Sequence, residues 1–271
     1  MANVDCTVLV TSCDAYRDVE EPFVKLFRKY WPDCPFELAV NGETGAAEGF
    51  DRVLLSGRGK TWSQMLVEAL DQIAAPYVIL LMNDYYLASR VETARMLSWL
   101  GVARSADALN LRLCPDPPGE TPFDLPADLV QSQTANDGDR RSAGALRLFA
   151  SAKNKAYAVS CKAGIWNRRF LRDLAARTRS AWEFERRGSY MFDESDPRPL
   201  LVTETQEFPF LDVVHKGYWE PWAVDFLRRE GLDVARSARG LPPWRVRAKE
   251  WLKKAVFNLN PDLVTRIQNT F

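Results

Sequence analysis

The chain has 271 residues, 46% of them hydrophobic, and its 36 Lys and Arg residues are matched by 36 Asp and Glu residues. This length and apolar content are enough for one large domain with a buried core. The balanced charge excludes a global attraction to nucleic acid or to a membrane, so we expect no nucleic-acid partner.

The cysteines and the N-terminus indicate a cytoplasmic protein. The five cysteines are scattered and lack the close paired spacing of a zinc site, which favours reduced thiols in a cytosol. The chain runs from Met1 directly into a strand-like segment, without the basic region and apolar stretch of an export signal. The longest apolar run, residues 73–82, is interrupted by Pro76 and is too short to span a bilayer.

Strands and helices are predicted to alternate along the first part of the chain. Short apolar runs predict strands at residues 7–10, 36–40, 52–55, 77–82 and 108–113. Apolar residues at helical spacing predict helices at residues 19–30, from 61–63 to the stop at Pro76, and 91–102. The run 77–82 is apolar on both faces, which is typical of a central strand covered by helices on each side.

The second part of the chain has a different texture. Residues 115–143 are rich in Pro, Gly and Asp, which predicts a long flexible surface loop. Strand patterns resume at 146–150 and 156–160, and a helix is expected at 167–176.

Residues 241–271 form a tail with its own pattern. Its apolar helical face consists of Trp244, Ala248, Trp251, Leu252, Ala255 and Leu259, and basic residues occupy the rest. A basic amphipathic helix of this kind predicts peripheral contact with an anionic membrane surface, at the inner face of the cytoplasmic membrane. The alternative is that the same face packs on the domain or on another subunit.

A series of short motifs follows one order along the chain. They lie at residues 10–16, 29–32, 61–63, 80–87, 163–167 and 182–185. Together they resemble bacterial glycosyltransferases of the GT-A fold that act in polysaccharide and lipopolysaccharide assembly, over roughly residues 4–235. The resemblance implies a Rossmann-like α/β domain, residues 1–240, with a mostly parallel central sheet flanked by helices, followed by the C-terminal amphipathic helical tail.

The resemblance also implies a nucleotide-sugar donor that lies across the carboxyl ends of the strands. Thr11, Ser12 and Asp14 match the position that meets the base and ribose, although such residues also cap the helix that follows. Asn41 closes the second strand in the same layer. Trp62 and Ser63 are expected to stack on and cap the donor, with a core Trp and an ordinary helix N-cap as the alternative.

Asn83 and Asp84 match the family's Asp-x-Asp element, which holds a divalent cation against the diphosphate. Asp84 supplies one hard oxygen ligand and Asn83 at most a weak carbonyl, so the departure from two carboxylates puts metal dependence in question. We expect Mg or Mn, with His215 resembling the late histidine that completes the metal shell. Lys216 is expected at the diphosphate, where it would replace part of the metal's work.

The catalytic base of an inverting transfer must be a carboxylate near the acceptor hydroxyl. Glu183 resembles the family's base position, and Glu185 and Asp193 are the alternatives. An acidic residue at a helix start is also common without any catalytic role, because it meets the positive end of the helix.

Three functions compete. The first is a glycosyltransferase that moves a sugar from a nucleotide-sugar donor to a glycan or lipid-linked acceptor in cell-envelope synthesis. The second is a catalytically inactive nucleotide-binding or scaffold protein on the same fold. Asn83, in place of an acidic residue, is the feature that supports this alternative. A nucleotidyltransferase would need a Gly-rich phosphate loop after the first strand, and residues 11–16 contain no Gly.

Overall fold

The computed structural model describes residues 5–124, 147–193, 195–233 and 239–245. The chain divides into two compact units, residues 1–212 and 213–271, and each is described by itself. The helices of the first unit are α1 (Arg17–Tyr30), α2 (Trp62–Gln72), α3 (Thr93–Ser105), α5 (Arg168–Ala175) and α6 (Ala181–Arg186), with 3-10 turns η1 (Asp14–Tyr16) and η2 (Gly188–Tyr190).

The first unit is built on one large sheet. Its strands, in spatial order, are β3 (Arg52–Leu55), β2 (Glu37–Gly42), β1 (Cys6–Thr11), β4 (Tyr77–Met82), β9 (Gly164–Asn167), β6 (Asn110–Arg112), β10 (Leu200–Thr203), β8 (Leu148–Ser151) and β7 (Thr121–Phe123). Only β9 and β8 run against the common direction of the described strands. A small two-stranded sheet pairs β5 (Tyr85–Leu87) with β11 (Phe210–Asp212).

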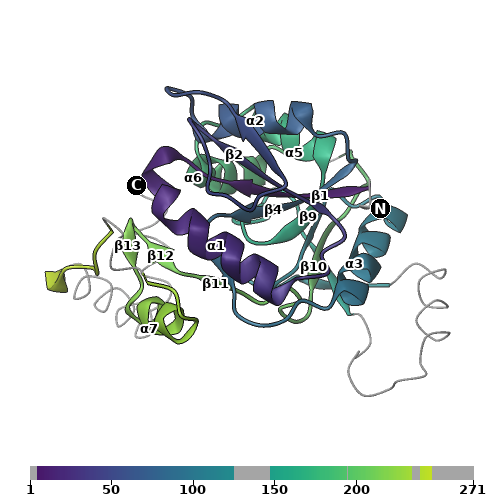
Figure 1. Ribbon diagram of the computed structural model, residues 1–271. Helices are drawn as coiled ribbons and strands as arrows, with labels where there is room; N and C mark the ends of the chain where they lie inside the picture. The colour runs from purple at the N-terminus through teal and green to yellow at the C-terminus, as the bar shows by residue number, and fades with distance from the viewer. Residues whose placement is uncertain (1–4, 125–146, 194, 234–238, 246–271) are drawn as a thin grey trace, which may run out of the picture. The chain divides into compact units, whose positions relative to one another are not determined.

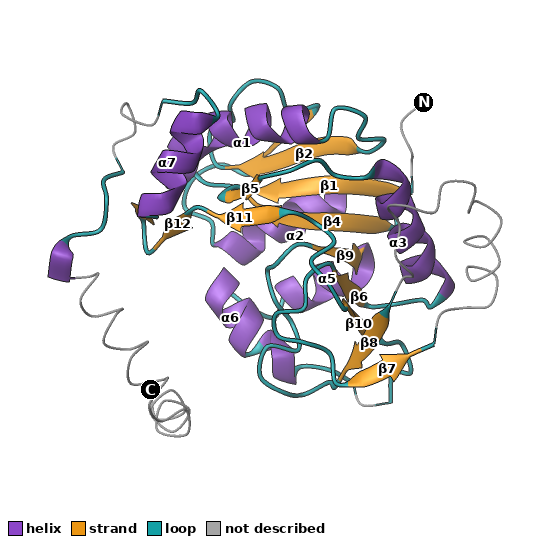
Figure 2. Cartoon of the chain, turned by 90° about the horizontal axis from the view of Figure 1, so that it is seen from below, coloured by secondary structure: helices purple, strands orange, loops and turns teal. Residues whose placement is uncertain are grey.

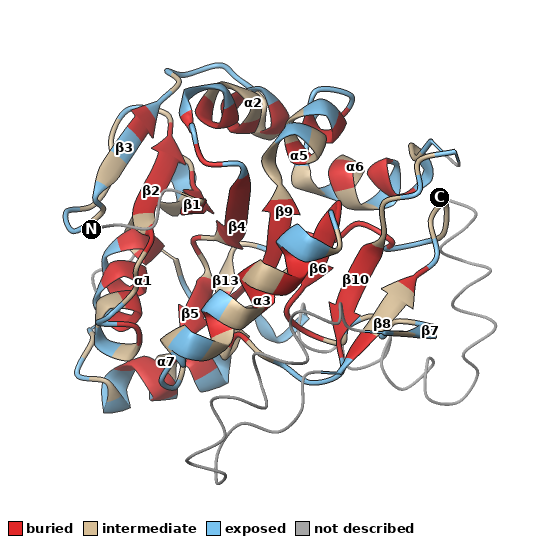
Figure 3. Ribbon diagram, turned by 90° about the vertical axis from the view of Figure 1, so that its right-hand side faces the viewer, coloured by how far each residue is buried: buried red, intermediate tan, exposed pale blue. Residues whose placement is uncertain are grey.

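Helices cover both faces of the sheet (Figure 1). On one face, α2, α5 and α6 contribute Leu66, Leu171 and Phe184 to a core that includes Leu9 and Leu80 of the central strands. On the other face lie α1 and α3, which the Trp31 indole joins by a 2.9 Å hydrogen bond to the Thr93 hydroxyl. Figure 3 shows β1, β4 and β10 buried, as strands covered on both sides must be.

The predicted fold class is confirmed: the structure is an α/β domain with a mostly parallel central sheet flanked by helices. The strand predicted at 156–160 is wrong. That segment forms turns and bends, in which Tyr157 has a φ of 57°, in the left-handed region that strands exclude. The strands β7 and β9 were not predicted, because runs of three and four residues give little periodicity.

The second unit contains β12 (Val214–His215), β13 (Tyr218–Trp219) and α7 (Pro221–Arg229) in its described part. The sequence predicts a domain boundary after residue 240, whereas the division of the chain into compact units falls between Asp212 and Val213. Most of the predicted tail, residues 246–271, lies outside the described residues, as does most of the predicted loop, residues 125–143. Within the described part, no helix combines the length and apolarity needed to span a bilayer.

A half-buried ion pair ties α3 to the segment before β11. The Glu207 carboxylate accepts hydrogen bonds from Arg95 at 2.7 and 3.0 Å, from the Trp99 indole at 3.0 Å and from the Thr205 hydroxyl at 2.7 Å. Although burial opposes the charged form, these bonds hold the pKa of Glu207 below its ordinary value. The stability it contributes is therefore present near neutral pH and is lost as the pH falls through that lowered pKa.

We expect Glu207→Ala to lower the free energy of unfolding by about 3 kcal/mol, because Arg95 and the Trp99 N–H lose their partner in a poorly hydrated site. Urea unfolding measures this value. Glu204→Ala is the matched control, since its ion pair with Arg147 is exposed and should contribute at most about 0.5 kcal/mol. Equal losses in the two variants would contradict the prediction.

Candidate functional site

The carboxyl ends of β1, β2 and β4 meet at one edge of the sheet (Figure 2). The parallel register places Thr11 beside Asn41 on one side and beside Met82 on the other. Asn83 follows Met82 directly, and its N–H donates to the Thr11 carbonyl at 3.2 Å. Three predicted site residues, far apart in the sequence, are thereby brought together where open α/β sheets bind ligands.

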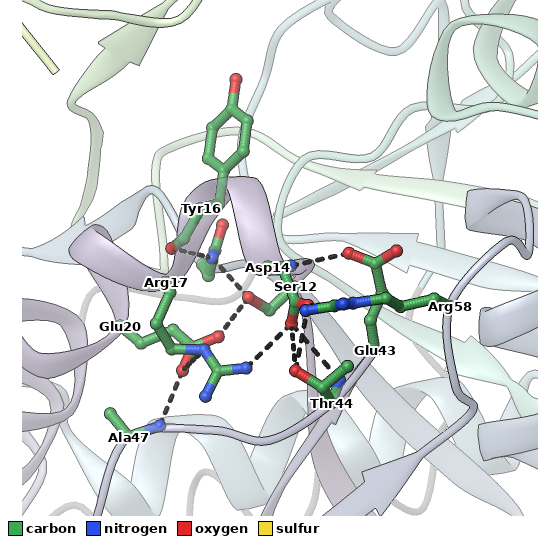
Figure 4. A network of polar contacts seen from close by, with 10 residues as sticks. Ser12, Asp14, Tyr16, Arg17, Glu20, Glu43, Thr44, Ala47 and Arg58 are labelled. Atoms are coloured by element: carbon green, nitrogen blue, oxygen red, sulfur yellow. Dashed lines mark hydrogen bonds and ion pairs between the residues drawn. The ribbon is translucent and has the colours of Figure 1, made fainter. Parts of the chain in front are cut away.

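Asp14 organises the loop that follows β2 (Figure 4). Its carboxylate accepts hydrogen bonds from the Thr44 hydroxyl at 2.9 Å, from Arg17 at 3.0 Å and from Arg58 at 3.3 Å, while its N–H donates to Glu43 at 2.8 Å. Although burial opposes the charged form, the bonds from Thr44 and Arg58 lower the pKa of Asp14. In this structure Asp14 joins the turn after β1 to residues 43–58.

Ser12 and Asn83 link the turns after β1 and β4. The Asn83 amide donates to the Ser12 hydroxyl at 2.8 Å and to the Tyr16 carbonyl at 3.1 Å, and the Ser12 hydroxyl donates to Glu20. Glu20 is fully buried and also accepts from the Ala47 N–H at 2.7 Å; burial raises its pKa above the ordinary value. Both predicted residues thus hold the edge of the sheet in shape.

Asn41 has the most unusual environment at this edge. Its side chain is fully buried, yet among the described residues neither its amide nitrogen nor its carbonyl oxygen has a hydrogen-bond partner. Because side chains alternate along a strand, Asn41 shares the α2-facing side with Ala39, which packs in the core beneath α2. Buried polar groups are almost always paired, so these two atoms indicate a place for a polar ligand or an ordered water.

The N-terminus of α2 lies at the same edge, because α2 leads through a short connection to the amino end of β4. Thr61 caps the helix through a reciprocal capping box with Gln64. Trp62 packs on Phe184 with ring centroids 5.5 Å apart, and its buried indole N–H has no partner among the described residues. The Ser63 hydroxyl is buried and shares a 2.9 Å hydrogen bond with the Thr178 hydroxyl. Ser63 therefore does not cap the helix, and Thr61 does.

Asp84 lies between β4 and β5, in a region with two further carboxylates that sequence reasoning did not assign to it. Asp212 lies opposite Tyr85 in the β5–β11 register. Burial raises the pKa of the Tyr85 hydroxyl, and the charges of Asp84, Asp212 and Glu185 raise it further. The pKa of the Cys161 thiol is likewise raised, by burial and by the charges of Glu185 and Asp84. Asp84 and Glu185 therefore act on the same buried groups.

The two candidate bases of α6 have different surroundings. Glu183 accepts from the Arg179 N–H at 2.9 Å and pairs with Arg187, while its own N–H donates to Ser180, as expected for a residue that caps a helix start. One oxygen of Glu185 accepts from the Cys161 N–H at 2.7 Å and from the Ser160 hydroxyl at 3.1 Å. Its other oxygen accepts no hydrogen bond from the described residues.

Two other candidates are tied into local structure. Asp193 accepts from the Ser195 N–H and hydroxyl at 2.9 and 2.6 Å, which is an exposed turn. Arg112, not predicted as a site residue, is buried at the carboxyl end of β6 and donates to the Pro117 and Tyr157 carbonyls at 2.8 and 3.3 Å. Burial lowers its pKa, partly offset by the nearby charges of Asp116 and Glu185.

The predicted metal and phosphate residues of the second unit lie in the β12–β13 hairpin. His215 pairs with Tyr218 in the ladder and is exposed. Lys216 occupies the turn with a φ of 51°, followed by Gly217 with a φ of 82°. Among the described residues, no three His, Cys, Asp or Glu side chains are grouped so that they could hold a metal ion.

No family model matches this chain, and no curated protein matches its sequence. It is similar to a crystal structure of S. aureus TarS 1-349, with 12% identity and a TM-score of 0.42 over 73% of this chain and 60% of that one. The structure of the same protein in complex with UDP-GlcNAc has 12% identity and a TM-score of 0.41, over 73% of this chain and 58% of that one. A cytidylyltransferase from Leptospira borgpetersenii has 8% identity and a TM-score of 0.37, over 84% of this chain and 96% of that one. The chain thus spans 60% or less of the TarS chains that it matches.

Proposed function

We propose that this protein is a glycosyltransferase that transfers a sugar from a nucleotide-sugar donor to a hydroxyl of a glycan or lipid-linked acceptor. The observation that carries the proposal is the buried Asn41 amide beside Thr11, whose two polar atoms have no hydrogen-bond partner in the part of the chain that the structure describes. An amide presents one donor and one acceptor, which matches the paired donor and acceptor on the edge of a nucleobase. The order of the motifs along the chain supports the same assignment.

Asp84 is the proposed ligand of the divalent cation. Mg²⁺ is commonly held by one or two carboxylates together with substrate phosphates, so Asp84, with Asp212 opposite Tyr85, fits a cation held mainly by the donor's diphosphate. When bound, Mg or Mn would stabilise the negative charge that develops on the leaving diphosphate. His215 as a further ligand and Lys216 as a phosphate contact remain proposals from the sequence.

The proposed base is a carboxylate of α6, and the geometry favours Glu185 over Glu183. The oxygen of Glu185 that accepts no hydrogen bond from the described residues is available for the acceptor's proton. As that proton moves to the carboxylate, the acceptor oxygen bonds to the anomeric carbon and the bond from that carbon to the diphosphate breaks. The products are a glycoside and a nucleoside diphosphate, and the anomeric centre inverts.

The test of the donor site is a titration of the full chain with UDP, GDP, CDP and TDP, each with and without Mn²⁺, followed by calorimetry and thermal shift. We expect one nucleotide to bind preferentially and Mn²⁺ to strengthen its binding. Failure of all four nucleotides to bind a folded sample would remove the proposal and favour a scaffold role.

Asn41→Ala should weaken binding of the preferred nucleotide about tenfold or more, because the base loses a paired donor and acceptor. An ordered water is the competing occupant of the same position. If water alone occupies it, Asn41→Ala would change the unfolding temperature and leave nucleotide affinity unchanged. Asp71→Ala, at an exposed ion pair with Arg172, is the control for a general effect of removing a polar side chain.

The acceptor and the pathway are proposed from the sequence resemblance. An acceptor in envelope polysaccharide or lipopolysaccharide synthesis is frequently lipid-linked, and a basic amphipathic tail at residues 241–271 suits an enzyme that works at an anionic membrane surface. The tail's support is its sequence pattern, since residues 246–271 are outside the described part of the chain.

A further inference from the structure

Helix α6 carries an aromatic side chain that the fold does not use. Trp182 is 68% exposed, whereas Trp31, Trp99, Trp166 and Trp219 are fully buried. On a helix, residues three and four positions apart lie on one face, so Trp182 shares its face with Glu185 and Arg186. The exposed Trp182 and the residue proposed as the base therefore lie one helical turn apart on α6.

The residues that flank Trp182 on α6 are charged. Arg186 and Arg187 are exposed, and Glu183 and Glu185 are half-buried. A membrane or a protein partner usually needs a contiguous apolar patch of a few hundred Å² or more. A sugar ring needs only one flat apolar surface for its C–H face, with charged groups at the rim to bind its hydroxyls.

We propose that Trp182 is the platform on which a pyranose ring of the acceptor stacks, with Glu185 and Arg186 binding hydroxyls at the edge of that ring. This inference rests on the proposed function and deepens it, because it assigns the acceptor side of the reaction. Stacking on Trp182 would orient one sugar hydroxyl toward Glu185. The 5.5 Å ring contact of Trp62 with Phe184, and the hydrogen bond from the Ser63 N–H to the Arg179 carbonyl, place α6 beside the start of α2.

The experiment is saturation-transfer NMR of the full chain with UDP and Mn²⁺ and with the methyl glycosides of glucose, galactose, mannose and N-acetylglucosamine as probes. We expect at least one glycoside to bind, and Trp182→Ala to weaken it about three- to tenfold. Trp182→Phe should retain most of the affinity because it keeps a flat ring. Trp182→Leu should behave like alanine, since it keeps apolar area without a stacking face.

The outcomes separate this inference from the proposed function. UDP binding without glycoside binding, or with glycoside binding unchanged in Trp182→Ala, would overturn the acceptor platform alone. Equal affinity in Trp182→Leu and Trp182→Phe would also overturn it, because stacking would not be involved. Glycoside binding that depends on Trp182 in a protein that binds no nucleotide would preserve the platform and remove the transferase. Thermal unfolding should be unchanged in all three variants, because Trp182 is largely exposed.

Discussion

Asp84→Asn is expected to lower turnover of the nucleotide sugar by about a hundredfold to a thousandfold, while the protein stays folded. The substitution keeps the size of the side chain and removes the one charged oxygen ligand that directly follows β4. Loss of several kcal/mol of charge stabilisation on the leaving diphosphate corresponds to a rate change of that size. Release of nucleoside diphosphate in the presence of Mn²⁺ is the measurement.

The same variant should lose the strengthening of nucleotide binding by Mn²⁺ and keep its metal-free affinity. Asp71→Asn is the matched control, because Asp71 forms an exposed ion pair with Arg172 on the helices behind the sheet. Normal turnover by a folded Asp84→Asn protein would remove Asp84 from the mechanism. If metal-free binding is lost as well, Asp84 acts in the shape of the nucleotide site rather than as a cation ligand.

The central half of the fold could be predicted because its strands are continuous apolar runs. Residues 77–82 and 52–55 were predicted with the bounds that β4 and β3 have, and the polar residues after 77–82 were expected at the edge where ligands bind. The segment at 156–160 could not be predicted correctly, because Ala158 and Val159 pack in the core from bends rather than from a strand. Buried turns and buried strands are both rich in apolar residues, so composition alone does not distinguish them.

The surroundings of the site residues depend on pairings that no local pattern reveals. Asn41 was expected at the edge, but its lack of partners follows from the register of β2 beside β1 and from the packing of α2. Asp212 reaches Tyr85 only through the pairing of β11 with β5, more than a hundred residues apart in the chain. Ser12 and Asn83 were recognised as polar edge residues, and only the structure shows that they bond to each other.

The assignment of the base to Glu185 rather than Glu183 also depends on tertiary packing. The two residues are two positions apart in one sequence motif, and both are acidic residues of a short helix. The packing of α6 against residues 160–161 decides their surroundings, because it brings Glu185 to the Cys161 N–H and leaves Glu183 at the helix start.

Glu185→Gln is expected to lower kcat by about a hundredfold to ten-thousandfold, because the amide accepts no proton from the acceptor hydroxyl. Nucleotide affinity should be unchanged, since the variant keeps the shape of the side chain and its hydrogen bond from Cys161. Glu183→Gln is the direct comparison: it weakens the cap and the ion pair with Arg187, which lowers the free energy of unfolding by about 0.5–1 kcal/mol. Its turnover should stay close to that of the unmodified chain.

The reverse result, with turnover lost in Glu183→Gln and kept in Glu185→Gln, would make Glu183 the base and assign Glu185 to holding residues 160–161. Steady-state kinetics with a fixed acceptor separates these cases, because loss of the base lowers kcat while loss of acceptor positioning also raises KM. Trp182→Ala completes the comparison, since a platform for the acceptor should raise KM most. The three variants together assign separate roles to three side chains of a six-residue helix.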